Sequence, residues 1–248
     1  MFHKNVKNLE IKEGAFFVAD AHYNKKDNPS FLEFLKQIEE KKLKPTQLFL
    51  LGDIFDALFG NVPYTAKDNQ DVIDVIIKLS KEIDIFYLEG NHDFYLKKFF
   101  PSNIKIFPIK THPVTFTCKD KKICLAHGDF DSPVGYMIYT ALIRNPFILF
   151  FLNIYDNLTN HSVLRFVDKH ISKKEECKEL KWFKEFSKNR LKKFKNCDIY
   201  IDGHFHQNKN YTYQHIKYIN LGAFACNQRY FVVKFNKNEI ILEEKRLH

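Results

Sequence analysis

The sequence predicts an α/β layered fold with neighbouring parallel strands, and three observations support this. Short apolar runs alternate with segments of helical spacing over the first 91 residues, residues 136–196 carry only helical signals, and strand patterns return from residue 197. Alternating strands and helices are typical of a parallel sheet covered by helices. The chain has 248 residues, of which 45% are hydrophobic, so it can form one large domain with a sizeable core.

The first half of the chain supplies the alternation. Apolar runs at 15–20, 47–53 and 83–91 are typical of buried strands. Apolar residues three and four positions apart predict helices over 31–42 and 71–83, between these strands.

The second half predicts a hairpin, a helical segment and a β-rich end. The hairpin consists of 113–118 and 121–129, and the later strands are expected at 197–206, 211–213, 216–224, 229–235 and 239–244. We therefore predict a core formed by 1–135 and 197–248, interrupted by a helical insert at 136–196 that forms a lid or cap.

Charge and cysteine content limit the kinds of partner and the cellular compartment that we expect. The formal charge of +9, from 39 Lys+Arg against 30 Asp+Glu, favours phosphate esters, nucleic acid or an acidic membrane face without choosing among them. The five cysteines contain no CxxC pair, so we expect reduced thiols in a cytoplasmic protein. No signal peptide is expected, and the apolar run at 146–155 is shorter than the roughly 20 residues that span a bilayer.

Five short polar motifs follow predicted strands. They are Asp20-Ala21-His22, Gly52-Asp53, Gly90-Asn91-His92-Asp93, His127-Gly128-Asp129 and Gly203-His204-Phe205-His206. Because ligand sites in α/β sheets lie beyond the carboxyl ends of the strands, we expect these motifs to converge on one edge. Asp-x-His alone is usually a turn. Gly-His-x-His alone is about equally typical of a functional site and of ordinary surface histidines. Their combination at five strand ends favours a functional site.

The residue types in these motifs suit a metal centre. Two carboxylates, one carboxamide and four imidazoles give seven candidate ligands: Asp20, His22, Asp53, Asn91, His127, His204 and His206. Mixed oxygen and imidazole ligands suit Mn, Fe or Zn, and the absence of cysteine argues against a structural zinc site. Seven ligands are too many for one ion and about right for two that share a carboxylate. Two ions about 3.5–4 Å apart stabilise the attacking and leaving oxygens of an in-line phosphoryl displacement.

The series D-x-H, GD, GNH[D], HGD and GHxH resembles the calcineurin-like metallophosphoesterases. The resemblance implies a four-layer αββα sandwich with a dinuclear centre, in which Asp53 bridges the two ions. It assigns one ion to Asp20, His22, Asp53 and His206, and the other to Asp53, Asn91, His127 and His204. It also implies that His92 acts on the substrate phosphate with Asn91 and Asp53, and that Asp93 orients a neighbour or caps the following helix. Manganese is the expected metal, with Fe or Zn as alternatives.

A narrower likeness concerns the substrate. GNHDFYL, the Gly135-Tyr136 pair, the helical insert and residues 221–224 resemble the UDP-2,3-diacylglucosamine pyrophosphatases of lipid A synthesis. This implies cleavage to UMP and the lipid 1-phosphate, with His92, Asp131, Lys173 and Lys174 contacting the substrate. Three departures leave a nucleotide or another soluble phosphoester as the alternative substrate. His92 stands where that family usually has Arg, residues 132–134 replace paired Asp, and Gln207-Asn208 replace Arg-Pro.

The insert carries 13 Lys+Arg against 6 Asp+Glu, with its apolar residues early and its cations late. It is either a cap whose apolar face packs on the core, or a lid for acyl chains that also rests peripherally on the cytoplasmic face of the inner membrane. In the second case, deleting the insert should abolish cleavage of a lipid substrate and spare a small phosphodiester. The expected partner is a phosphoester, most simply a nucleotide-linked lipid. We do not expect a nucleic-acid partner, and the sequence gives no oligomeric state.

Overall fold

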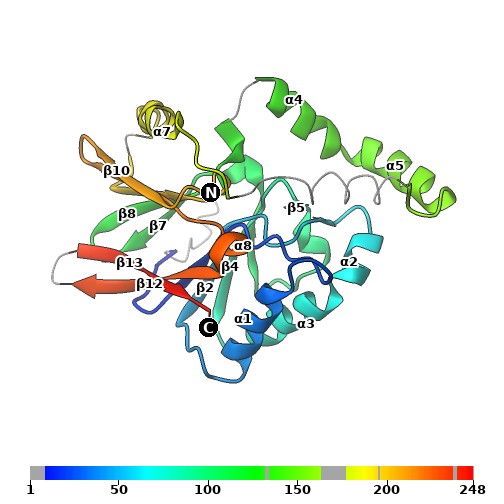
Figure 1. Cartoon of the computed structure of the whole chain (residues 1–248), viewed down its shortest axis with the longest axis horizontal. Coiled ribbons are helices and arrows are strands. Elements are labelled where there is room, and N and C mark those ends of the chain that lie inside the picture. Colours follow the sequence, from blue (N-terminus) through cyan, green and yellow to red (C-terminus); the bar gives the residue numbers. More distant parts are fainter. Residues whose placement is uncertain (1–8, 132–133, 163–176, 195, 237–238, 248) are drawn as a thin grey trace, which may run out of the picture.

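The computed structural model describes residues 9–131, 134–162, 177–194, 196–236 and 239–247. Two sheets lie face to face, with helices on their outer surfaces (Figure 1). The first sheet has six strands in the order β13-β12-β1-β2-β4-β6. Their bounds are β1 Phe16–Val18, β2 Gln47–Leu50, β4 Asp84–Leu88, β6 Lys105–Phe107, β12 Arg229–Asn236 and β13 Glu239–Arg246.

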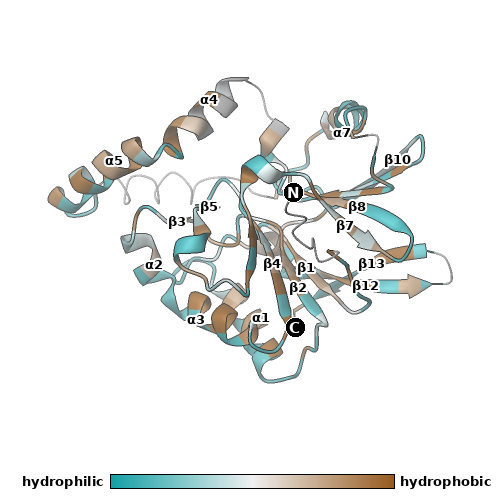
Figure 2. Cartoon of the chain, turned by 180° about the vertical axis from the view of Figure 1, so that it is seen from behind, coloured by the Kyte–Doolittle hydropathy of each residue, from teal (hydrophilic) through white to brown (hydrophobic). Residues whose placement is uncertain are grey.

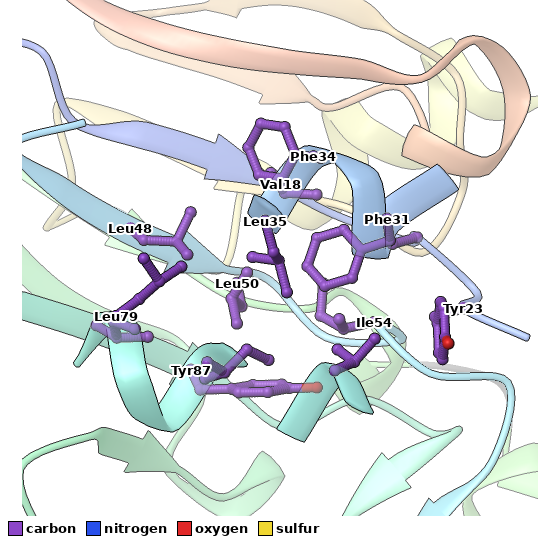
Figure 3. Packing of buried hydrophobic residues seen from close by; sticks show 14 of the residues in the cluster. Val18, Tyr23, Phe31, Phe34, Leu35, Leu48, Leu50, Ile54, Leu79 and Tyr87 are labelled. Carbon is purple, nitrogen blue, oxygen red and sulfur yellow. The ribbon is translucent and has the colours of Figure 1, made fainter. Parts of the chain in front are cut away.

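Strands β1, β2, β4 and β6 run parallel, and the sequence predicts the first three of them. Helices α1 (Ser30–Glu39) and α3 (Gln70–Leu79) connect them and cover one face. Side chains of a strand alternate between the two faces. Leu48 and Leu50 of β2 therefore lie against the helices, together with Phe34 of α1 (Figure 3), while Phe49 lies against the second sheet.

The second sheet has five strands in the order β10-β11-β9-β8-β7. Their bounds are β7 Val114–Cys118, β8 Lys121–Leu125, β9 Ile199–Asp202, β10 Lys209–Tyr213 and β11 Ile216–Asn220. Phe49 joins the sheets, because its ring stacks on Phe17 at 4.4 Å and meets Phe116 edge-on at 5.4 Å between centroids. Helix α7 (Phe183–Leu191) packs on the outer face through Phe183 and Leu191. The predicted αββα layering is confirmed.

Several elements were not predicted, and some strands are shorter than expected. The unpredicted elements are β3 (Leu58–Phe59), β5 (Asp93–Phe94), β6, α2 (Tyr64–Asp68), α8 (Phe224–Asn227) and the 3-10 helices Leu96–Lys98, Ile109–Thr111 and Asp129–Asp131. They are too short to show a periodicity. The strand predicted over 197–206 ends at Asp202, so the Gly-His-x-His segment is not extended; His204 and His206 have φ of 60° and 58°.

Helices α4 (Val134–Ile143) and α5 (Pro146–Leu158) extend away from the sheets (Figure 1). Asn145 begins α5, since its side chain accepts hydrogen bonds from the amides of Phe147 and Ile148. Most residues of α5 are apolar (Figure 2), and several of their side chains are exposed, with Phe147 and Leu158 at 75% and 80%. Packing of this surface on the core, one of the two interpretations of the insert, is therefore not seen among the described side chains. None of the described helices is both long and apolar enough to cross a membrane.

The expectation of five reduced thiols is wrong. Cys124 pairs with Cys197, and Cys177 pairs with Cys226, with Cα atoms 5.9 and 5.7 Å apart. These distances lie in the range that a disulfide requires. The partners are 73 and 49 residues apart in the chain, so only the pairing of strands and loops brings them together. Cys118 is a buried free thiol, and burial raises its pKa to about 11.

We expect thiol titration of the denatured, non-reduced protein to detect one cysteine, Cys118. All five cysteines should react after reduction. In the native protein Cys118 should be alkylated slowly, because a buried thiol of raised pKa holds little thiolate. Alkylation followed by mass spectrometry measures this, and Cys118→Ser is the control that should show no thiol before reduction. Five reactive thiols in the denatured, non-reduced protein would contradict the pairing.

Candidate metal centre

The polar motifs converge at one edge of the two sheets, beyond the carboxyl ends of their strands. Asp20, Asp53 and Asn91 follow β1, β2 and β4 of the first sheet. His127 follows β8, and the Gly-His-x-His segment follows β9 of the second sheet. Backbone hydrogen bonds join neighbouring motifs, from the Asp20 amide to the Gly52 carbonyl (3.1 Å) and from the Gly203 amide to the His127 carbonyl (2.8 Å).

Asp20, His22 and His206 form one group of potential ligands, with donor atoms within 4.8 Å of one another. The Asp20 carboxylate lies 3.3 Å from Nε2 of His206. The ring centroids of His22 and His206 are 5.6 Å apart. One oxygen ligand and two imidazoles therefore face a common point. We call this set, with the expected bridge Asp53, the first ligand group.

Asp53, His127 and His204 form a second group within the same 4.8 Å limit. Nε2 of His127 lies 3.3 Å from Asp53 Oδ2 and 3.3 Å from Asn91 Oδ1, so Asn91 belongs with them. The structure thus places the predicted ligands in two groups, with Asp53 in the second, and their assignment to two metal ions stays a prediction. We call Asp53, Asn91, His127 and His204 the second ligand group.

The tautomer of His127 suits metal binding. Its Nδ1 lies 2.8 Å from the Leu51 carbonyl, which can only accept a hydrogen bond. Nδ1 therefore carries a proton, which leaves Nε2, the atom that faces Asp53 and Asn91, to bind a metal ion once it is deprotonated.

Five of the seven candidate ligands have left-handed backbone conformations. Asp20, His22, Asp53, His204 and His206 have φ between 44° and 60°. A residue other than glycine rarely adopts this conformation, and each instance costs about 1–3 kcal/mol. Such strain persists only where surrounding contacts hold it, and it is concentrated at functional sites.

Asp93 holds the turn that carries Asp53. Its Oδ1 accepts hydrogen bonds from the amides of Asp53 (3.0 Å) and Gly90 (2.8 Å). Its Oδ2 accepts from the Ile54 amide and the Tyr87 hydroxyl. Burial and the nearby Asp53 raise the pKa of Asp93 to about 7. Asp93 therefore orients a neighbour and does not cap the following helix, one of the two roles expected for it.

The charges at the site suit cations. Burial disfavours the charged form of Asp53, but His127, His92 and His22 hold its pKa well below the usual range. Burial opposes protonation of His127, yet Asp53, with Asp129 and Asp20, raises its pKa well above the usual value. An ionised carboxylate between imidazoles, with further oxygen donors nearby, is a donor set that divalent cations prefer. The residues present therefore fit two divalent metal ions.

His92 lies beside the two groups. Its amide donates to Asp53 Oδ1 at 2.8 Å, and its Nδ1 donates to the Asp56 carbonyl at 2.8 Å. Its ring meets His22 edge-on, with centroids 5.0 Å apart. The Asp56 carboxylate in turn lies 3.3 Å from Nδ1 of His22. These contacts hold His92 beside Asp53 and His22, and its action on the substrate phosphate stays a prediction.

We expect His92→Ala to retain both metals and to lower kcat about 10²-fold, the usual loss when a positioned acid or charge-stabilising group is removed. Metal content by atomic emission and steady-state kinetics measure the two effects. His215→Ala, at an exposed histidine, is the matched control. Unchanged turnover in His92→Ala would show that this side chain takes no part in the reaction.

Sequence reasoning missed three charged residues near the site, Asp56, Arg144 and Arg190, and it named Asp129 in a motif without giving it a role. Only the Asp53-x-x-Asp56 and His127-x-Asp129 spacings could have indicated the two carboxylates. The arginines lie far from every motif in the chain. The predicted substrate contacts Lys173 and Lys174 lie outside the described residues, as does the side chain of Asp131.

The fold and this site define a metal-dependent hydrolase. The chain belongs to the calcineurin-like phosphoesterase family, whose model matches residues 16–208.

Two curated relatives are similar over most of their length. A protein of Wigglesworthia glossinidia brevipalpis named UDP-2,3-diacylglucosamine hydrolase is 25% identical over 240 residues, covering 89% of this chain and 94% of that protein. A protein of the same name from Histophilus somni is 25% identical over 237 residues, covering 91% and 98%. Among solved structures, a dimetal phosphatase from Danio rerio has a TM-score of 0.49 at 13% identity, covering 94% of this chain and 96% of that chain.

Proposed function

We propose that this chain hydrolyses the pyrophosphate of UDP-2,3-diacylglucosamine to UMP and 2,3-diacylglucosamine 1-phosphate, in lipid A biosynthesis. The names of the similar proteins support this substrate. The observation that carries the proposal is an exposed apolar helix that begins at the metal centre, as a substrate with both a pyrophosphate and acyl chains requires.

Helix α5 is tied to the site at its start. Arg144 lies just before it, and the Arg144 carbonyl accepts a hydrogen bond from the Tyr95 hydroxyl at 2.6 Å. Leu149 is buried against Val62 and Phe94, next to the loop of Asn91. The exposed apolar side chains of α5 are Phe147, Phe150, Phe151, Leu152, Ile154, Tyr155 and Leu158. A surface of this kind suits acyl chains or the acidic face of a membrane.

A cavity of about 400 Å³ with many polar lining residues lies beside the site. It extends from Asp56, the neighbour of His22, to His161 after the end of α5, and Lys25 and Tyr64 also line it. Binding cavities for small molecules span about 300–1,000 Å³. The cavity therefore offers room and polar contacts for the nucleoside part of the substrate.

We propose Asp20, His22, Asp53 and His206 as ligands of one ion, and Asp53, Asn91, His127 and His204 as ligands of the other. Manganese is the proposed metal, with Fe or Zn as alternatives. Divalent ions bound there would polarise the phosphoryl oxygens and lower the pKa of a water molecule. His92 would stabilise charge on the same oxygens or protonate the leaving group. Asp53 and Asn91 would contribute to catalysis by keeping the ions and His92 in position.

We propose a cytoplasmic location, with α5 as a peripheral contact on the inner face of the membrane, and the proposed substrate supports it. Disulfides persist mainly in oxidising compartments, so the two cysteine pairs argue against a reducing cytosol. The thiol titration described above, applied to protein trapped with an alkylating agent in cells, tests the location.

The second candidate function is hydrolysis of a nucleotide or another soluble phosphoester. The observation that favours it is His92, because the lipid A family usually has Arg at that place. A soluble-substrate enzyme would gain nothing from detergent micelles and would not need the apolar surface of α5.

The test is UMP release from UDP-2,3-diacylglucosamine with Mn²⁺ in detergent, compared with hydrolysis of bis-nitrophenyl phosphate. We expect rapid Mn²⁺-dependent release of UMP. A Phe150→Ser, Phe151→Ser variant should lose most of its activity on the lipid and retain its activity on the small ester. The exposed polar change Lys188→Ser is the control. Absent UMP release, with Mn²⁺-dependent cleavage of the small ester, would reject the lipid substrate and favour the second candidate.

A further inference from the structure

Two arginines of the proposed insert contact the loops that carry the metal ligands. We propose that Arg144 and Arg190 are positioning residues that hold the second ligand group, so that the insert is part of the metal centre as well as a lid. This inference rests on the proposed metal site and does not depend on which phosphoester is the substrate.

Arg190 of α7 is 1% exposed and joins two of these loops. One guanidinium nitrogen donates to Asp202 Oδ2 at 2.7 Å, and another donates to the Gly128 carbonyl at 2.5 Å. Gly128 directly follows His127, and Asp202 stands two residues before His204. One buried side chain thus fixes the distance between the backbones that carry two ligands of the second group.

Rings and a polar network hold Arg190 in place. Its guanidinium lies over the rings of Phe186, Phe205 and Phe130, at 4.8, 5.2 and 5.4 Å from their centroids. Asp202 also accepts from the Tyr218 hydroxyl at 2.9 Å and from Asn220 at 2.7 Å. With its planar group enclosed in this way, Arg190 forms a rigid bridge and is not a mobile surface cation.

Arg144 makes a second bridge, from the joint between α4 and α5. It donates to the Gly90 carbonyl at 2.9 Å and to Asp129 Oδ2 at 3.0 Å. Gly90 precedes Asn91, and Asp129 lies two residues after His127. Together the two arginines link the loops of Asn91, His127 and His204, which are the ligands that the second group does not share with the first.

If the two arginines acted through their charge alone, they would weaken metal binding, whereas a positioning role would strengthen it. A cation near a metal site repels the metal, so removing it would strengthen metal binding if charge were its only role. Removing Arg190 would also leave Asp202 without its ionic partner, which adds to the attraction for a cation. A positioning role predicts weaker binding, because outer contacts that orient ligands typically contribute about 10–100-fold to metal affinity. The sign of the change therefore separates the two roles.

Deletion of the whole insert therefore does not test its role as a lid alone. Deleting 136–196 removes both arginines, so it should lower activity on small esters too, contrary to the expectation from sequence that such activity is spared. Substitutions confined to the exposed surface of α5 avoid this loss.

The experiment is Mn²⁺ titration of the chelator-stripped, full-length protein, with free Mn²⁺ read by electron paramagnetic resonance. A His22→Ala background isolates the second ligand group, and a His204→Ala background isolates the first. We expect Arg144→Gln and Arg190→Gln to raise the dissociation constant of the second group about 10–100-fold and to leave that of the first group unchanged. Lys188→Gln removes a charge from the same helix as Arg190 and should change neither constant.

Unchanged or tighter Mn²⁺ binding by the second group in folded Arg144→Gln and Arg190→Gln would overturn the inference, as would equal weakening of both groups. If Arg190→Gln does not fold, the Arg190→Met, Asp202→Asn double variant removes the bridge without leaving an unpaired charge. It should show the same selective loss, and circular dichroism checks its fold. Absence of Mn²⁺ binding by the unsubstituted protein would instead reject the metal site itself, and with it the proposed function.

Discussion

Replacing Asp53 by alanine should remove both metals and lower activity by about 10³-fold or more, because metal stabilisation of the reacting oxygens is worth several kcal/mol. The expected loss of both ions follows from the proposed assignment of this carboxylate to both ligand groups. One oxygen lies 3.3 Å from His127 of the second group, and the other accepts from the His92 amide at 2.8 Å. No other predicted ligand is assigned to both groups.

Metal content after gel filtration and the rate of phosphodiester hydrolysis at saturating Mn²⁺ measure this prediction. Asp27→Ala changes an exposed aspartate in the loop after β1 and should preserve metals and rate. Circular dichroism confirms that the Asp53 variant is folded. Retention of two ions by a folded Asp53→Ala protein would contradict the bridging assignment.

The second large effect concerns Gly90, the residue that ends the apolar run before Asn91. A Cβ atom at this position would lie 2.2 Å from Asp53 Oδ1 and 2.5 Å from the Asp53 amide nitrogen. Gly90→Ala must therefore push the two loops apart. Overpacking of this kind costs about 1–3 kcal/mol of stability. Because Asp53 is displaced, we also expect Mn²⁺ affinity to fall by about 10-fold or more, the usual loss when a ligand is no longer oriented.

Gly135→Ala is the matched control, since a Cβ there meets nothing within 4 Å. It lies in α4, where alanine should be neutral or stabilising. Urea denaturation gives the free energy of unfolding, and Mn²⁺ titration gives the affinity. If Gly90→Ala equalled the unsubstituted protein in both, the close approach of these loops would play no part in the metal centre.

The sequence by itself determined the layered fold and the composition of the site. Both depend on local patterns in the chain. Strands are indicated by alternating or continuous apolar residues, and helices by apolar residues three and four apart. The site is indicated by the polar motifs that follow the strands. Parallel strands place their carboxyl ends at one edge of a sheet, so the positions of Asp20, Asp53 and Asn91 in the chain are enough to predict that they meet.

Only the tertiary structure decided how the side chains at that edge are held. The left-handed backbone of His204 and His206 replaced the extended segment that their spacing suggested, because contacts from other loops hold it. The cysteine pairs and the exposed surface of α5 likewise depend on which segments become neighbours.

Arg144 and Arg190 show most directly why the sequence alone could not predict how the ligands are held. Arg190 reaches Gly128, which is 62 residues away in the chain, and Arg144 reaches Gly90, which is 54 residues away. A single long-range bond leaves no periodic or short-range pattern in a sequence. It forms because packed helices and sheets have already brought the two backbones together, which is why the convergence of the polar motifs could be predicted from the sequence and the contacts that hold them could not.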